Sequence, residues 1–595
     1  MVGAASMMNT MRMAAIAGGA LSLIASPVSA QSGGSMVAHY ERAERADVHR
    51  SDSLPTLLSP EEHTLYRNIF AAIDAQDWQR VEDLLDDARG GVLHQIAAAE
   101  YYTHANSPRA SGEAIARWLA AGVHLPQAPQ LGRMGAGRGL ANLPQFPAEQ
   151  GLRYQGEAPK RIRPRSVNDG TMPESARAAI LDGITNDDPM RAYNVLVEVD
   201  PFLSPEARAE WRQRVAWGFY IENDDENALA LAEKVSDGAG PWVAEGEWVA
   251  GLAAWRLGFC ALASESFARA ASASTNLELT SAAHYWAHRA LIRCREPGQA
   301  SDHLVAASRY GETLYGILAS DQLGMEPVST KPGGTFTPAD WRALEARPNA
   351  RIAIALSEIG RTALADEVLR HEARIGDRRA YASLGRLART LGLPSTQVFM
   401  AHHAPSGVST DPALRYPVAS WRPKTGWRVD PALAFAHALQ ESNFRASAVS
   451  PANARGLMQI RPGTARDHNR TLELGASYAD LNDPEINLTY GQQHLEMLRD
   501  ASATGGKLPK IMAAYNAGLS PVSRWNSEIN DQGDPLLWME SIPYWETRGY
   551  VSIVMRNYWM YERAAGVPSP SRRALAQGMW PSFPVMSQVR TAQAD

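Results

Sequence analysis

A single carboxylate stands at the end of an apolar stretch of helical period, and two segments of small and polar residues follow it. Glu441 closes the stretch that begins at Pro431. Gly-Leu-Met-Gln-Ile comes at 456–460, and Ala-Ala-Tyr-Asn-Ala-Gly at 513–518. A lone acid in apolar surroundings that faces polar groups is suited to protonating the oxygen of a glycosidic bond.

Two effects favour the neutral form of Glu441. The C-terminal end of a helix carries partial negative charge, which disfavours a carboxylate. Apolar neighbours remove solvation from the charged form. Both effects raise the pKa, so the sequence predicts a carboxyl group that is protonated near neutral pH. The spacing alone leaves a second interpretation open, in which Glu441 lies exposed at a frayed helix end.

The downstream segments supply groups that can contact a sugar. Gly456 permits close approach of the backbone, and the Gln459 amide can both donate to and accept from an acetamido group. Tyr515 ends a helix expected from Leu508, where its hydroxyl can hold the acid or the bridging oxygen. Each residue alone is typical of a helical core, and only their combination indicates a site.

Four blocks in one order resemble the soluble lytic transglycosylases of glycoside hydrolase family 23, which have a goose-lysozyme-like catalytic domain. Residues 441–444 match E-S-x-[FW], and 450–465 resemble S-x-x-G-A-x-G-L-M-Q-[IV]-x-P-x-T-A. Residues 513–518 match A-A-Y-N-A-G, and 542–550 resemble I-P-[FY]-x-E-T-[RK]-x-Y. Two positions depart from the pattern. Asn453 replaces a usual Gly, although Asn tolerates a left-handed backbone, and Ala446 replaces a common Pro.

The resemblance implies cleavage of the β-1,4 bond between N-acetylmuramic acid and N-acetylglucosamine in peptidoglycan. The muramyl 6-hydroxyl then closes on C1 to give a 1,6-anhydro end, and no water is added. Glu441 is expected to act first as acid and then as base, with no cofactor and no metal. By correspondence with the family, the expected substrate-binding residues are Ser450, Met458, Gln459, Tyr515 and Asn516. Glu546 is expected to support the site by orienting Tyr515 or the helix ends.

Two other functions remain open. A lysozyme-type hydrolase that retains configuration needs a second carboxylate about 5–5.5 Å from the first, and the candidates by proximity in sequence are Asp467, Asp480 and Asp483. Alternatively, the chain is a helical scaffold whose last domain only binds glycan. The presence of Glu441 and Tyr515 argues for the enzyme.

The rest of the chain predicts a mostly α protein. A chain of 595 residues with 45% hydrophobic content is longer than a single hydrophobic core usually supports, so we expect several domains. The family's long members carry an N-terminal superhelix and a small linker domain. The expected units are a signal peptide (1–30), a linker (31–55), an α-superhelical repeat domain of helix pairs (56–327), a helical linker domain (328–420), a lysozyme-like catalytic domain (421–566) and a tail (567–595).

Three tryptophans mark the expected repeat. Trp211, Trp248 and Trp286 lie 37 and 38 residues apart, and a turn and a second apolar helix follow each one. A single helix pair cannot bury its own apolar face, so neighbouring pairs must stack into a solenoid. Because the spacing follows the repeat, we expect these tryptophans in the core rather than on a sugar-binding surface.

Export and partners follow from the composition. Arg12 precedes an apolar run of Met13 to Ile24, and small residues precede Gln31, which is typical of a signal peptide and predicts a periplasmic protein. No later run is long enough for a transmembrane helix. The expected partner is the peptidoglycan glycan strand, with cell-wall enzymes as further partners of the superhelix. A net charge of -6 gives no reason to expect nucleic acid.

Two further features complete the sequence. The Gly- and Pro-rich stretch 127–165 carries five basic residues, Arg153, Lys160, Arg161, Arg163 and Arg165. We expect it to be a surface segment wrapped over the helices, with contact to an acidic polymer as the alternative. Cys260 and Cys294 lie among apolar helical neighbours, which favours two unpaired buried thiols, although an oxidising compartment permits a disulfide.

Overall fold

The computed structural model describes residues 54–88, 90–325, 334–472 and 479–584. The expected signal peptide and all but the last two residues of the expected linker 31–55 lie outside these ranges. Helices dominate the described residues, and their only named sheet has two short strands, which confirms the mostly α prediction. No helix within these ranges combines the length and the apolar character that a bilayer crossing requires.

Among the described residues before β1, five α-helices form an N-terminal bundle. They are α2 (Pro60–Asp74), α3 (Trp78–Asp87), α4 (His94–Thr103), α5 (Gly112–Gly122) and α6 (Ala128–Ala136). The first begins with a reciprocal cap, in which Ser59 Oγ accepts from the Glu62 amide and the Glu62 carboxylate accepts from the Ser59 amide. The stretch 127–165, predicted as a surface segment wrapped over the helices, begins with helix α6, and only the part after Ala136 is extended.

Within the described range 174–322, nine α-helices form the superhelix. They are α7 (Glu174–Thr185), α8 (Pro189–Val199), α9 (Pro205–Ile221), α10 (Asp225–Ala232), α11 (Trp242–Leu257), α12 (Cys260–Ala273), α13 (Leu277–Arg293), α14 (Pro297–Ser308) and α15 (Leu314–Gln322). Trp211, Trp248 and Trp286 lie on α9, α11 and α13, the first helices of successive pairs. All three are at most 2% exposed. The prediction that they are core residues is confirmed, because all three belong to the hydrophobic core that runs through the superhelix.

The middle helices are α16 (Pro338–Leu344), α17 (Pro348–Glu358), α18 (Thr362–Ile375), α19 (Tyr381–Thr390) and α20 (Pro394–His402). The C-terminal domain holds α21 (Pro431–Ser442), α22 (Pro462–Leu472), α23 (Pro484–Asp500), α24 (Leu508–Ala517), α25 (Leu519–Glu528), α26 (Pro535–Glu540), α27 (Trp545–Ala564) and α28 (Pro570–Ala576). The last helix lies in the stretch predicted as a tail, where Leu575 is fully buried. Its few apolar residues were too sparse to show a helical period.

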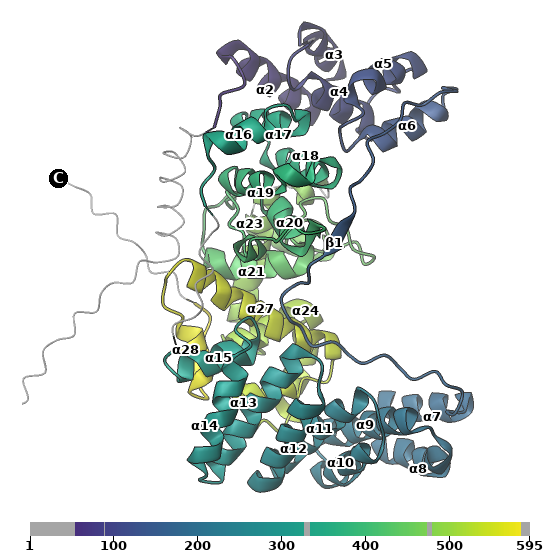
Figure 1. The fold of residues 1–595 in the computed structure, drawn as a ribbon, viewed down its shortest axis with the longest axis vertical. Helices are drawn as coiled ribbons and strands as arrows, with labels where there is room; N and C mark the ends of the chain where they lie inside the picture. Colours follow the sequence, from purple (N-terminus) through teal and green to yellow (C-terminus); the bar gives the residue numbers. More distant parts are fainter. Residues whose placement is uncertain (1–53, 89, 326–333, 473–478, 585–595) are drawn as a thin grey trace, which may run out of the picture.

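Two large hydrophobic cores divide most of the described residues, and a small third cluster contains Ala209, Val235 and Trp242. One large core joins the N-terminal bundle to the middle helices, and the other joins the superhelix to the C-terminal domain. Figure 1 shows α2–α6 at the top and α7–α14 at the bottom, with the C-terminal domain between them. The stretch 56–327, predicted as one repeat domain, therefore contributes to both large cores. Helical period alone does not indicate which partner each helix packs against.

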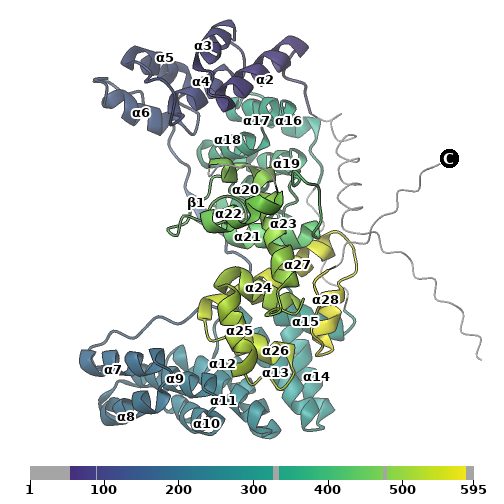
Figure 2. The same cartoon turned by 180° about the vertical axis from the view of Figure 1, so that it is seen from behind.

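The segment between α6 and α7 is extended and connects the N-terminal bundle to the superhelix. Strand β1 (Leu152–Tyr154) pairs antiparallel with β2 (His403–Pro405), so the segment is fixed to the end of α20. It then continues to the start of α7, along the side seen in Figures 1 and 2.

Cys260 and Cys294 form a disulfide with Cα atoms 5.6 Å apart, which corrects the expectation of unpaired thiols. Cys260 begins α12 and Cys294 caps the end of α13. These antiparallel neighbours bring the two residues together at the end of the pair that lies away from its connecting turn. Sequence spacing could not show this, because it does not fix the separation of two Cα atoms.

Candidate functional site

Glu441 lies in the last turn of α21, a helix with well-defined ends. Asp430 Oδ1 accepts from the Ala432 amide at its start, where Pro431 occupies the first position. Asn443 ends the helix in a left-handed conformation with φ of 50°. The residues between are nearly all buried, so the helix is part of the core and presents Glu441 at its half-buried end.

Tyr550 is the hydrogen-bond partner of Glu441. Its hydroxyl donates to Glu441 Oε1 at 2.7 Å from the second turn of α27, where the tyrosine is only 4% exposed. Burial raises the pKa of Glu441 to about 7, the Tyr550 hydrogen bond opposes this rise, and the negative charge of Glu546 adds to it. The predicted upward shift of the Glu441 pKa is therefore present, with burial as its largest cause.

The ring of Tyr515 stacks on that of Tyr550. The ring centroids are 6.4 Å apart and the ring planes lie at 9°. The Tyr515 hydroxyl donates to the Met458 carbonyl at 2.7 Å, so it holds the 456–460 segment. The hydrogen bond to the acid, predicted for Tyr515, is made by Tyr550. The signal for Tyr550 was its place four residues after Glu546, on the same face of one helix.

Neutral histidines fill the space beneath the tyrosines. His437, one turn before Glu441, is fully buried, and its Nδ1 lies 2.9 Å from the Leu433 carbonyl, to which it donates. Burial lowers the pKa of His437 to about 4, and burial likewise lowers the pKa of His494 to about 4. Both rings contact the ring of Tyr515. The core behind Glu441 therefore stays uncharged at neutral pH and offers no cation that would favour its ionised form.

The loop after α21 is held by close backbone contacts. Ser442 Oγ donates to the Leu457 carbonyl at 2.8 Å. Gly456 has φ of 73°, and a Cβ there would overlap the Leu481 carbonyl and the Asn487 amide. Asn453 also adopts a left-handed backbone with φ of 62°, as expected from its substitution for glycine. The loop thus keeps its shape despite this departure.

Asn487, on α23, was not found from the sequence. Its Oδ1 accepts from the Met458 amide at 2.8 Å, and its Nδ2 donates to the carbonyls of Arg455 and Leu481, both at 2.8 Å. This fully buried side chain replaces the hydrogen bonds that the irregular 455–458 backbone cannot make with itself. A buried Asn within a helix was the available signal.

Three residues expected to bind substrate, Met458, Ser450 and Gln459, differ in their burial and in their hydrogen bonds. Met458 is fully buried with its sulfur against Gly491, so its side chain offers no surface to a sugar; this corrects that expectation. Ser450 Oγ accepts from the Ala454 amide at 3.0 Å and closes the loop turn. Gln459 is half-buried, and its amide donates to the Gly456 carbonyl at 2.9 Å.

Two residues connect α24 and α27 beside the site. Asn516 Oδ1 accepts from Thr547 Oγ1 at 2.7 Å, which fixes the end of one helix to the start of the other. Glu546 is exposed and acts on Glu441 through its charge. Within the described ranges, no three His, Cys, Asp or Glu side chains are arranged to hold a metal ion.

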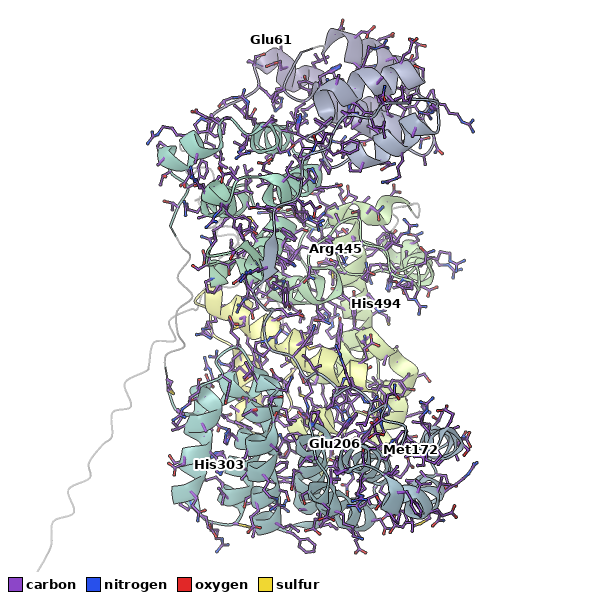
Figure 3. The ribbon with its side chains drawn as sticks, turned by 45° about the vertical axis from the view of Figure 1, so that its right-hand side comes forward. Glu61, Met172, Glu206, His303, Arg445 and His494 are labelled. Atoms are coloured by element: carbon purple, nitrogen blue, oxygen red, sulfur yellow. A yellow bond between two sulfur atoms is a disulfide. The ribbon has the colours of Figure 1, made fainter. Side chains whose placement is uncertain are left out.

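The site lies in the middle of the molecule. Figure 3 labels Arg445, in the loop after α21, and His494, on α23, between the upper and lower groups of helices. Residues 444–447 of the same loop border a cavity of about 800 Å³, whose other walls include parts of α2, α4 and α18. Residues from both large hydrophobic cores therefore face this space.

Comparison with known proteins places these features in one family. The Transglycosylase SLT domain model matches residues 421–536. The putative soluble lytic murein transglycosylase of Haemophilus influenzae is 39% identical over 136 residues, or 22% of each chain. The soluble lytic murein transglycosylase of Escherichia coli K12 is 36% identical over 133 residues, 22% of this chain and 20% of the relative. These matches span about a fifth of the length of either relative.

A shorter relative is covered more fully. The endo-type membrane-bound lytic murein transglycosylase A of Klebsiella pneumoniae (strain 342) is 33% identical over 143 residues, which are 22% of this chain and 70% of the relative.

Two solved structures are similar over most of the chain. The 70 kDa soluble lytic transglycosylase of Escherichia coli matches with a TM-score of 0.51 at 17% identity, covering 89% of this chain and all of that one. An inactive mutant of the lytic transglycosylase Slt of Pseudomonas aeruginosa matches with a TM-score of 0.51 at 18% identity, covering 90% and 93%. These likenesses confirm the predicted fold, a helical superhelix with a lysozyme-like C-terminal domain.

Proposed function

This chain belongs to the lytic murein transglycosylase family, and we propose that it cleaves the β-1,4 bond between N-acetylmuramic acid and N-acetylglucosamine with Glu441 as its single acid and base. The observation that carries the proposal is the state of Glu441. Burial raises its pKa to about 7, and its carboxyl accepts one hydrogen bond from a neutral tyrosine. Such a group can give up and recover a proton near neutral pH.

The proposed reaction has two proton transfers. Glu441 gives its proton to the bridging oxygen as the bond from that oxygen to C1 breaks. The muramyl 6-hydroxyl then attacks C1, and its proton passes to the Glu441 carboxylate, which restores the starting acid. The acetamido oxygen of the substrate stabilises the cation at C1 in between. Because the nucleophile belongs to the substrate, its effective concentration is high.

Tyr550 supports the intermediate stage. A hydroxyl that donates to a carboxylate stabilises the ionised form more than the neutral one. The 2.7 Å hydrogen bond to Glu441 therefore favours the first proton transfer. Burial acts in the opposite direction, so the two effects together hold the acid near the point at which both transfers are feasible.

The positions of the carboxylates near the site support a reaction with an anhydro product over hydrolysis. Asp483 Oδ1 accepts from the amides of Glu485 and Ile486 as the cap of α23, and Asp467 is exposed on α22. Among the described carboxylates, only Glu546 has a charge that raises the pKa of Glu441. Its exposed position suits a modulating charge rather than a base that holds water.

The remaining assignments follow from the family and the half-buried rim of the site. We assign Gln459, Tyr515 and Asn516 to substrate contact, and Ser450 to the shape of the loop. The N-terminal sequence and the cell-wall names of the relatives support export to the periplasm, with residues 1–30 as signal peptide. The superhelix is the proposed surface for cell-wall enzymes.

Digestion of purified sacculi by wild type and by Glu441→Gln tests the proposal. We expect the wild type to release muropeptides with 1,6-anhydro ends, detected by mass spectrometry. Glu441→Gln should still bind sacculi but release no muropeptides. Glu528→Gln is the matched control, because Glu528 is exposed on α25. Reducing ends in place of anhydro ends would establish the hydrolase, and full activity of Glu441→Gln would exclude Glu441 as the acid.

A further inference from the structure

The basic stretch that sequence analysis singled out is partly buried between two domains. We define the strap as residues 155–167, which run from β1 along the superhelix toward α7. Its backbone is fixed at several points. The Lys160 carbonyl accepts from Asn276 Nδ2 at 2.9 Å, and the Arg165 carbonyl accepts from Trp242 Nε1 at 3.0 Å. The Pro159 carbonyl accepts from Arg556, which lies on α27.

Arg161 is the central contact of the strap. Its Nε and Nη2 donate to the two carboxylate oxygens of Glu245, on α11, at 3.2 and 2.7 Å. Its Nη1 lies 4.0 Å from Glu540, at the end of α26. The guanidinium also lies 4.9 Å from the ring centre of Trp248 and 5.9 Å from that of Trp545. With its side chain 13% exposed, it connects superhelix and C-terminal domain in one contact.

Trp545 is the first residue of α27, the helix that carries Tyr550. The N-terminal cap residue, Tyr544, makes no side-chain capping hydrogen bond, so this helix start is not fixed in the usual way. The hydrogen bond from Thr547 to Asn516 holds its first turn to α24, and further contacts hold it to the strap and the superhelix. From the strap, the guanidiniums of Arg161 and Arg163 lie 5.9 and 5.6 Å from the ring centre of Trp545. The Arg548 guanidinium lies 4.1 Å from the ring centre of Trp217 on the superhelix.

The first turns of α27 face two ways. Trp545, Arg548, Ser552 and Arg556 line a small cavity against the strap and the superhelix. Glu546 and Tyr550 are four residues apart and share a different face, toward Glu441. A displacement of the helix start caused by loss of the strap contact would therefore move the Tyr550 hydroxyl relative to the acid.

We propose that the strap fixes the start of α27 through Arg161, and that Arg161 is thereby a positioning residue for the Tyr550–Glu441 pair. Charge supports this arrangement. Arg161 donates to the Glu245 carboxylate and lies 4.0 Å from that of Glu540, while Arg548 Nη1 donates to the Glu540 backbone carbonyl at 3.2 Å. Loss of Arg161 therefore removes a buried cation from beside both carboxylates. The inference rests on the proposed function, since it assigns Arg161 a role in the reaction of Glu441.

A double-mutant cycle tests the proposal. Arg161→Ala, Tyr550→Phe and the double variant are compared with wild type for turnover of soluble glycan strands of defined length. We expect Arg161→Ala to lower kcat by up to roughly 10-fold, the effect of losing the Tyr550 hydroxyl itself, with little change in KM. In the Tyr550→Phe background the same substitution should change kcat less than about 2-fold, because residues that act through one contact are not additive.

Matched variants separate this effect from loss of charge or of fold. Arg165→Ala removes a cation from an exposed side chain of the same strap, and wild-type kcat is expected. Arg161→Lys keeps the buried charge without the paired hydrogen bonds, and it enters the same cycle in place of Arg161→Ala if that variant does not fold. An equal loss in both backgrounds, or wild-type kcat for both Arg161 variants, would overturn the proposal. Full activity of Glu441→Gln would instead overturn the function on which it rests.

Discussion

The Glu441 site and the junction between the superhelix and the C-terminal domain both bury ionisable side chains, but they differ in whether the buried group has an oppositely charged partner. At the junction the buried cations Arg161 and Arg256 each have an anionic partner, Glu245 and Asp225 respectively. Within the described residues, Glu441 has no such cation, and its bonded partner is the neutral Tyr550. A buried group that is paired keeps its charge, whereas an unpaired one is free to exchange its proton.

A raised pKa alone does not identify the catalytic acid. Burial raises the pKa of Glu278 to about 7 and that of Glu562 to about 8. Those carboxylates are at most 7% exposed and hold local structure, Glu278 by accepting from the Leu314 amide at 3.0 Å and Glu562 by accepting from the Ser569 hydroxyl. Glu441 differs because it is half-buried and stands at a helix end, where a substrate can reach it.

The largest effect in this comparison is expected from breaking a pair at the junction. Arg256 donates to Asp225 at 3.2 Å, to the Tyr220 carbonyl at 2.8 Å and to Ser541 of the C-terminal domain at 2.9 Å. Arg256→Met leaves Asp225 buried without its cation, so we expect a loss of about 3–5 kcal/mol in the free energy of unfolding. Urea unfolding followed by circular dichroism measures this loss.

Two controls sharpen this prediction. Arg256→Met combined with Asp225→Leu removes both charges and should recover much of the lost stability, since an apolar pair of similar volume can replace a buried ion pair. Arg177→Ala breaks a pair with Glu174 that is exposed on both sides, and no measurable change is expected. If Arg256→Met unfolds like wild type, the junction does not depend on charge pairing.

The same contrast explains which parts of the structure were predictable. Glu441 could be placed from sequence because the period of α21 and the residues after it are local signals. Tyr550 and Asn487 could not be assigned their contacts, because their partners come from helices distant in the chain. Met458 was misassigned because its motif does not show on which side of the loop the side chain lies. Burial of Arg161 was missed because a basic stretch between Gly and Pro predicts exposure.

Tyr550→Phe is expected to have an intermediate effect, on catalysis rather than stability. The hydroxyl favours the ionised form of Glu441, so its loss raises the Glu441 pKa above about 7. The acid must be protonated for bond cleavage, so activity is present below this pKa and lost above it. The basic limb of the pH profile of kcat should move to higher pH, and kcat itself should fall roughly 10-fold, as for loss of a hydrogen bond to a charged group. An unmoved limb would contradict the role of this hydrogen bond.

Glu546→Gln is expected to have the smallest effect, in the opposite direction. The negative charge of Glu546 raises the pKa of Glu441, so its removal lowers that pKa and moves the basic limb to lower pH. Because Glu546 is exposed and screened by solvent, added salt should reduce the difference between variant and wild type. The measurement is the pH profile at low and high ionic strength, with Glu528→Gln as the exposed control. A loss of activity at every pH would instead give Glu546 a direct part in the chemistry, as a hydrolase requires of its second carboxylate.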